Sequence, residues 1–175
     1  MTDPFEPVAL DAHAAHHRID QLAAVLVDAV DSGASVSFMA PFRHAEAVAY
    51  WQGVVAAVAA GRVVLLVAPA AGRVDGTVQL HLATPPNQAH RAEIAKLLVH
   101  RRARGRGIAR RLMAAAERQA LARGRTLLTL DTLVGGGADR LYQRLGWTRA
   151  GVIPRYARLP HGPLGDTVIF YKELG

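Results

Sequence analysis

The chain has 175 residues, 51% of them hydrophobic, which is enough for a folded core and excludes a disordered chain. It contains no cysteine, which excludes disulfides, a cysteine nucleophile and thiolate metal sites. The formal net charge of +7 points to an anionic partner, and because no signal peptide or bilayer-long apolar run is visible, we expect one cytoplasmic domain over residues 1–175.

The first half of the chain predicts two helices followed by two strands. Apolar residues three and four positions apart predict helices over 11–30 and 43–60. The segment between them, 33–39, is compatible with a loop or a short helix. Two apolar runs, 63–68 and 74–83, then predict buried strands.

The second half alternates strands and helices. The predicted elements are a strand over 91–99, a helix over 105–123, a strand over 126–130 that ends at Asp131, a short helix over 138–145, and strands over 147–153 and 167–173. The resulting order, α-α-β-β-β-α-β-α-β-β, predicts an α/β (α+β) fold in which helices flank a mixed sheet.

A glycine turn, defined as residues 102–109, lies between the strand over 91–99 and the next helix, and its sequence is Arg-Ala-Arg-Gly-Arg-Gly-Ile-Ala. The first backbone N–H groups of a helix lack intrahelical partners, and the helix macrodipole adds partial positive charge there. Gly105 and Gly107 let a bulky anion approach that backbone. The turn therefore predicts a phosphate or pyrophosphate site; the alternative is a basic loop that only caps the helix.

Other phosphate and nucleic-acid motifs do not fit. A P-loop needs Lys-Ser/Thr where Ile108-Ala109 stands, and a dinucleotide motif needs glycine where Arg110 stands. Nine of the 21 basic residues lie within 101–125, so a polyphosphate ligand accounts for much of the charge. No nucleic-acid-binding motif is evident, and we expect neither a nucleic acid nor a membrane as partner.

Two motifs resemble the GCN5-related N-acetyltransferase (GNAT) family. One is R-x-x-G-x-G, formed by Arg102, Gly105 and Gly107; the other is Leu-Tyr-Gln-Arg-Leu-Gly-Trp over 141–147, which resembles the family's L-Y-x-x-L-G-F/W segment. The resemblance implies a mostly antiparallel GNAT sheet and acetyl-coenzyme A (acetyl-CoA) as co-substrate, with no metal. It implies cofactor binding by the backbone of Leu97, Leu98 and Val99 and by Arg102, Arg104, Gly105, Arg106, Gly107, Ile108 and Ala109.

The same resemblance implies roles for three side chains in acetyl transfer. Tyr142 matches the tyrosine near the thioester sulfur, where it would protonate the departing thiolate; the alternative is a core aromatic residue. Glu93 and Asp131 are candidates for taking the amine proton. Carboxylic acids have a pKa of about 4 in water, so a carboxylate is a weak base for an amine. A water relay, or simple binding of a cationic amine, is therefore as plausible as direct proton abstraction. The structural alternatives are a salt bridge of Glu93 with Arg91 or Lys96, and a loop cap for Asp131.

Several further segments, including 33–40 and 171–175, resemble a branch of the family that inactivates an amino-acid-like toxin. The sequence therefore predicts an acetyl-CoA-dependent N-acetyltransferase for a small-molecule amine, as a monomer or homodimer. The alternatives are a protein N-acetyltransferase and a non-catalytic acyl-CoA-binding module. We expect the N-terminal helices and the 154–165 loop to roof the site and to favour small acceptors.

Overall fold

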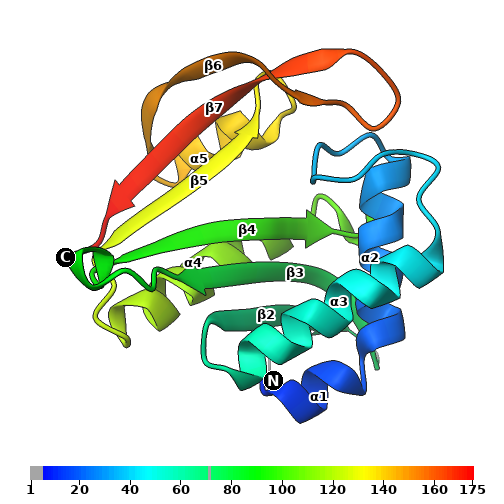
Figure 1. The fold of residues 1–175 in the computed structure, drawn as a ribbon, viewed down its shortest axis with the longest axis horizontal. Helices are drawn as coiled ribbons and strands as arrows, with labels where there is room; N and C mark the ends of the chain where they lie inside the picture. The colour runs from blue at the N-terminus through cyan, green and yellow to red at the C-terminus, as the bar shows by residue number, and fades with distance from the viewer. Residues whose placement is uncertain (1–5, 71) are drawn as a thin grey trace.

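The computed structural model describes residues 6–70 and 72–175 and contains one sheet of seven strands in the order β1-β2-β3-β4-β5-β7-β6 (Figure 1). The strands are β1 (Val8–Leu10), β2 (Val63–Ala70), β3 (Arg73–Leu82), β4 (Arg91–Val99), β5 (Leu127–Leu133), β6 (Thr148–Arg158) and β7 (Leu164–Glu173). The helices are α1 (Ala12–His16), α2 (Ile19–Asp31), α3 (His44–Ala59), α4 (Ile108–Leu121) and α5 (Ala138–Arg144), with short 3-10 turns at Pro86–Gln88 and Arg101–Ala103.

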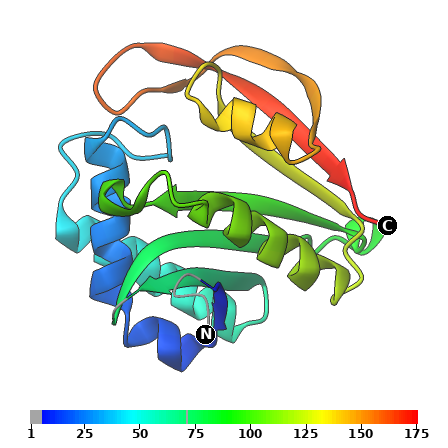
Figure 2. The same ribbon diagram turned by 180° about the vertical axis from the view of Figure 1, so that it is seen from behind.

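Two apolar cores hold the helices to the sheet. The core between α1–α3 and the first strands includes Leu22, Leu26 and Trp51, all fully buried. The core on the opposite face packs α4 against β2–β4 and includes Leu112 and Met113. Figures 1 and 2 show these helices on opposite faces of the β2–β4 half, while α5 lies beside β5. None of the described helices is both long and apolar enough to cross a membrane.

The predicted fold class is confirmed, because every predicted element is present and the sheet is mixed and mostly antiparallel. Two N-terminal details were wrong. The single helix over 11–30 is two helices, α1 and α2, because Arg18 leaves the helical conformation (φ −110°, ψ 12°) just before the apolar pattern of α2 begins. The three-residue strand β1, which pairs with the edge of β2, was not predicted.

Three element boundaries also differ from the prediction. Helix α4 begins at Ile108 rather than Gly105, because Gly105 (φ +78°) and Gly107 (φ +76°) have left-handed backbone conformations that a right-handed helix excludes. Strand β5 continues to Leu133, so Asp131 lies inside the strand rather than at its end. Strand β6 extends to Arg158 and β7 begins at Leu164, so only 159–163 of the expected 154–165 loop lie outside the strands.

The sheet opens where β4 meets β5. These strands pair in parallel only from Arg91 to Glu93, against Leu127 to Thr129, and separate beyond that point (Figure 1). The edge of β4 past Glu93 therefore faces an opening, where its backbone N–H and C=O groups have no strand partner on that side. This opening positions the candidate site.

A β-bulge bends β4 at the same place. Thr77 pairs with Leu98 and Gln79 with Ala95, so two residues of β4, Lys96 and Leu97, lie opposite one residue of β3. Lys96 has a φ of +50°, and the buried Thr77 hydroxyl donates to the Lys96 carbonyl at 3.0 Å. Without this hydrogen bond the bulge would leave a carbonyl unsatisfied.

Candidate active site

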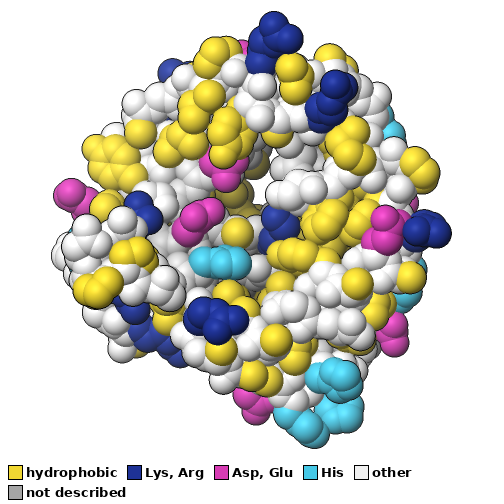
Figure 3. Space-filling model, viewed as in Figure 1, with side chains coloured by type: hydrophobic (Ala, Val, Ile, Leu, Met, Phe, Trp, Pro, Cys, Tyr) yellow, Lys and Arg dark blue, Asp and Glu magenta, His cyan; other side chains and the backbone are white. Residues whose placement is uncertain are grey.

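A cavity of about 580 Å³ lies in the opening between β4 and β5. Its walls come from the loop 32–37 after α2, from 93–99 of β4, from 131–133 of β5 and from α5, with Arg104 and Ala109 at one end. The space-filling view shows this face hollowed near its centre, with acidic, basic and histidine side chains around the hollow (Figure 3). Segments distant in the sequence therefore converge on one site.

The structure brings most of the predicted site residues to this cavity. Those that line it are Glu93, Leu97, Leu98, Val99, Arg104, Ala109, Asp131 and Tyr142. Arg102, Gly105, Arg106, Gly107 and Ile108 lie beside it, in the glycine turn and at the start of α4. The cavity and the N-terminus of α4 are thus neighbouring parts of one elongated region.

The N-terminus of α4 is open. Gly107 is its N-cap and no side chain caps the helix, so the first-turn N–H groups keep their donor capacity. A Cβ atom built at Gly105 or at Gly107 would meet nothing within 4 Å. The backbone at this end presents donors and partial positive charge to open space, which suits a bulky anion.

Two arginines at the start of the glycine turn, Arg101 just before it and Arg102 as its first residue, bind buried aspartates. Arg101 donates to Asp28 of α2 through its backbone N–H, at 2.9 Å, and through Nε. Arg102 donates from Nε to Asp75 of β3 at 2.7 Å and from Nη2 to the Val74 carbonyl at 3.0 Å. These contacts tie the turn to α2 and β3, so two donor groups of Arg102 are used structurally, which the sequence did not predict.

Arg104 reaches the cavity instead. Its Nε donates to the Val99 carbonyl at 3.1 Å, which holds the exposed guanidinium beside the edge of β4. Of the predicted charge partners for phosphate, Arg104 is thus the one that lines the cavity wall.

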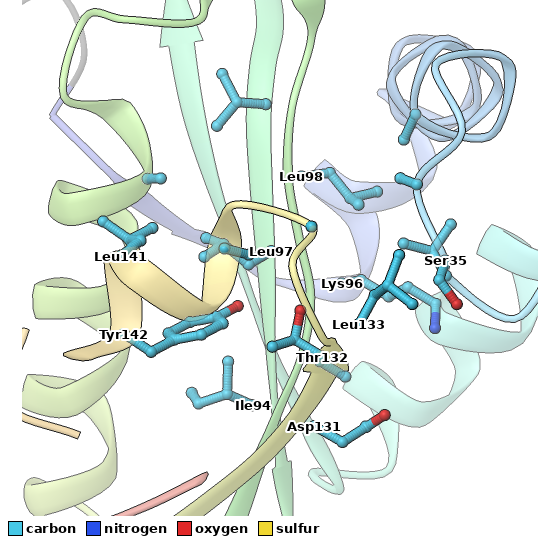
Figure 4. A pocket seen from close by; sticks show the side chains of 18 of the residues that line it. Ser35, Ile94, Lys96, Leu97, Leu98, Asp131, Thr132, Leu133, Leu141 and Tyr142 are labelled. Carbon is cyan, nitrogen blue, oxygen red and sulfur yellow. The ribbon is translucent and has the colours of Figure 1, made fainter. Parts of the chain in front are cut away.

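Tyr142 is buried on α5, with its hydroxyl directed into the cavity (Figure 4). Its ring packs against Trp147, with centroids 6.0 Å apart, and against Phe170, at 5.8 Å. Helix α5 ends at Arg144; Gly146, two residues later, has a φ of +79°, and Lys172 donates to the Leu145 carbonyl at 2.8 Å, which satisfies a carbonyl at the end of the helix. Burial, and to a lesser extent the nearby Asp131 carboxylate, raise the pKa of Tyr142, so the phenol stays protonated.

Glu93 on β4 and Asp131 on the neighbouring strand β5 both line the cavity. Glu93 pairs in register with Thr129, and Asp131 lies two residues further along β5, on the same face as Thr129. Both residues are exposed, and neither forms an ion pair within 4 Å with any residue that the structure describes. The alternative salt bridges of Glu93 are therefore not formed: Arg91 donates to Gln88 at 2.6 Å instead.

Lys96 is a cavity residue to which the sequence analysis gave no role in the chemistry. Its Nζ lies 3.3 Å from Ser37 Oγ and sits over two aromatic rings, 5.9 Å from the centroid of Phe38 and 5.8 Å from that of Tyr50. Burial lowers the pKa of Lys96, while the Asp131 and Glu93 carboxylates oppose that shift. A signal was present in the sequence, since Lys96 is one of only two lysines in an arginine-rich chain and interrupts an apolar strand.

A buried polar chain lies behind Lys96. Gln79 of β3 is fully buried; its Nε2 donates to Tyr50 Oη at 3.0 Å and its Oε1 lies 2.8 Å from His81 Nε2. Burial and the nearby Lys96 cation lower the pKa of His81, which favours the neutral ring. Among the residues that the structure describes, no group of three or more metal-ligating side chains comes together.

A strand pair that separates around a cavity, with an uncapped helix N-terminus at one end, suits an elongated ligand that carries an anionic group. The model of the Acetyltransferase (GNAT) family matches residues 28–147. The chain belongs to this family and is an acetyl-CoA-dependent N-acetyltransferase.

Solved structures support the fold over nearly the whole chain. Ribosomal-protein-alanine N-acetyltransferase from Brucella melitensis is 22% identical, with a TM-score of 0.78, and the match covers 96% of this chain and 99% of that one. An N-acetyltransferase from Staphylococcus aureus Mu50 is 20% identical, with a TM-score of 0.79 and coverage of 97% and 99%. A Salmonella typhimurium protein solved with its cofactor acetyl-CoA is 17% identical, with a TM-score of 0.77 and coverage of 99% and 95%. At these identities the likeness is one of fold.

Proposed function

We propose that this enzyme acetylates the amine of a small molecule, as toxin- and antibiotic-inactivating members of its family do. The observation that carries the proposal is the meeting of three groups in one cavity: the protonated Tyr142 phenol and the Glu93 and Asp131 carboxylates, which form no ion pair with another described residue. The resemblance to tabtoxin resistance protein, which acts on an amino-acid-like toxin, supports a small acceptor.

The residues present fit acetyl-CoA. The open, uncapped start of α4 at Gly107, together with Gly105 and Arg104, suits the pyrophosphate. The unpaired edge of β4 over 97–99 offers backbone donors and acceptors to the amide groups of the pantetheine arm. When bound, acetyl-CoA supplies the activated acyl carbon and a sulfur leaving group.

The chain's own groups manage the protons. Asp131 or Glu93 attracts the acceptor ammonium and takes its proton, directly or through a water, which leaves the free amine as nucleophile. The Tyr142 hydroxyl holds a proton for the leaving sulfur. The apolar surroundings of the Tyr142 ring keep that hydroxyl neutral and directed into the cavity.

The shape of the site favours small acceptors over peptides. The loop 32–37 closes one side of the cavity, and beyond it the Ala40 N–H donates to the Pro160 carbonyl at 3.0 Å, which joins this loop to the β6–β7 turn. A peptide substrate would need an open groove across this bridge. The expected roof from the 154–165 segment is thus reduced to this contact, since none of the described residues from that segment lines the cavity.

The test is coenzyme A release, followed with a thiol reagent, over a panel of amino acids, diamines, aminoglycosides and N-terminal peptides. We expect turnover with at least one small amine and none with peptides. Turnover with peptides alone would replace the proposal with protein acetylation. Tight coenzyme A binding by calorimetry, without turnover on any acceptor, would instead indicate a non-catalytic acyl-CoA-binding module.

A further inference from the structure

Lys96 is held in the cavity by an unusual backbone. It is a non-glycine residue with a φ of +50°, in the bulge that the Thr77 hydroxyl stabilises. A positive φ is unfavourable for a side chain that is not glycine and persists where the surroundings impose it. Figure 4 shows the Lys96 amine and the Asp131 carboxyl group at the same side of the cavity. The bulge therefore positions the Lys96 ammonium beside the Asp131 carboxyl group, where we expect the acceptor to bind.

The ammonium group of Lys96 has few partners there. Among the residues that the structure describes, its three N–H donors make one long hydrogen bond, to Ser37 at 3.3 Å, and its ammonium lies near the faces of Phe38 and Tyr50. No carboxylate among the described residues lies within 4 Å of it. A half-buried cation with spare donors is stabilised when an anion meets it.

We propose that Lys96 determines acceptor specificity by binding an anionic group, so that the preferred acceptors carry a carboxylate as well as the amine. The ammonium end of such a zwitterion is drawn to Glu93 and Asp131, and its carboxylate completes the hydrogen bonds of Lys96. This inference rests on the proposed function and narrows its substrate class.

The same charges disfavour other amines. A polyamine or an aminoglycoside brings a second cation beside Lys96, where the like charges repel each other. Two other arginines, Arg155 and Arg158, lie on β6 and are not among the described residues that line the cavity. Within the cavity wall near the two carboxylates, Lys96 therefore supplies the positive charge.

The test compares amino acids with their own carboxamides, for example L-lysine with L-lysinamide. For each variant the ratio of kcat/KM for acid to carboxamide is measured, and this ratio is compared between variants so that the intrinsic basicity of each amine cancels. Lys96→Met keeps the apolar stem over Phe38 and Tyr50 but removes the charge, and Lys96→Arg restores a charge. Arg158→Met is the matched control, because it removes one positive charge outside the cavity.

We expect the acid-to-carboxamide ratio to fall roughly 10- to 100-fold in Lys96→Met, through KM, because a charge-assisted hydrogen bond is lost. The ratio should recover partly in Lys96→Arg and stay unchanged in Arg158→Met. Calorimetry of the amino acid on enzyme saturated with coenzyme A should show the same loss of affinity without any turnover.

Three outcomes overturn the inference. Equal losses for acid and carboxamide in Lys96→Met assign Lys96 to a step shared by all acceptors or to the fold. If the wild-type enzyme uses carboxamides as well as acids, and Lys96→Met leaves the acid-to-carboxamide ratio of kcat/KM unchanged, Lys96 does not determine specificity, while the proposed function stands. A wild-type enzyme that acetylates no small amine refutes the proposed function, and the inference falls with it.

Discussion

The ring of Tyr142 lies in an apolar environment, whereas its hydroxyl is available for hydrogen bonding in the cavity. The ring packs against Trp147 and Phe170, while the hydroxyl points into the cavity (Figure 4). Because burial raises the pKa of Tyr142, the group can donate a hydrogen bond or a proton but does not act as a base near neutral pH. This environment matches an acid for the leaving sulfur.

Tyr142→Phe removes only the hydroxyl and keeps the ring. We expect kcat to fall by about 100-fold or more, since general acid catalysis contributes on that scale, while coenzyme A affinity and thermal stability change little. Steady-state kinetics and calorimetry measure the two effects, and Tyr171→Phe on β7 serves as the control. An unchanged kcat would make Tyr142 structural or leave protonation of the sulfur to water.

The two carboxylates can be told apart by the pH dependence of the rate. Asp131→Asn keeps the shape of the side chain and removes its charge. If Asp131 takes the amine proton, kcat/KM should fall most at low pH, where the acceptor is protonated, and should recover partly as the pH rises and free amine becomes abundant. The same profile for Glu93→Gln assigns the role between them. Wild-type profiles in both variants would mean that the acceptor arrives already deprotonated.

At the scale of single residues, the sequence indicated which side chains lie near one another in the cavity, but not all of the contacts that they make. Glu93, Asp131 and Tyr142 were expected to share a site, and they do line one cavity. The position of Lys96 depends on a bulge that shifts the β4 register by one residue, and the partner of Arg102 is an aspartate 27 positions earlier, on β3. Neither fact can be obtained from local spacing.

At the scale of elements, the glycine turn and the N-terminus of α4 together form the candidate anion site. Positive φ angles at Gly105 and Gly107 let the chain turn from β4 into α4, and they leave the N-terminus of the helix without side-chain cover. The strand, turn and helix order was predictable from apolar periodicity. The helix start was misplaced by three residues, because periodicity does not report the sign of φ.

Gly107→Glu should abolish measurable coenzyme A binding, since a side chain with negative charge would stand where the pyrophosphate approaches. Gly124→Glu is the matched control: Gly124 has a φ of +67°, also faces open space, and lies beyond the far end of α4. Both variants carry the same kind of backbone strain, so calorimetry isolates the effect on the ligand. Equal losses in the two variants would attribute the effect to folding, and unchanged affinity in Gly107→Glu would refute the pyrophosphate site.

Taken as a whole, the molecule is one sheet in two halves, β1–β4 and β5–β7, each with its own helices, and the halves are joined at one end by the short β4–β5 pairing and by a shared apolar core (Figures 1 and 2). At the open end, the hydrogen bond from Ala40 to Pro160 joins them again. The order of elements predicted a mixed sheet but not the point at which it opens, because strand length alone does not show where pairing stops. The cavity is thus a property of the tertiary structure rather than of any one segment.

The charge of the whole chain gives a final prediction. The net charge is +7, and nine of the 21 basic residues lie within 101–125, around the predicted pyrophosphate site. Raising the salt concentration from about 0.05 M to about 0.5 M shortens the Debye length, so coenzyme A affinity should weaken on the order of tenfold.

Pantetheine, which has the same thiol arm without the phosphates, should bind more weakly and with little salt dependence. Calorimetry across a salt series measures both ligands. Equal salt dependence for the two would show that the positive charge acts on the fold or on the acceptor instead of on the phosphates.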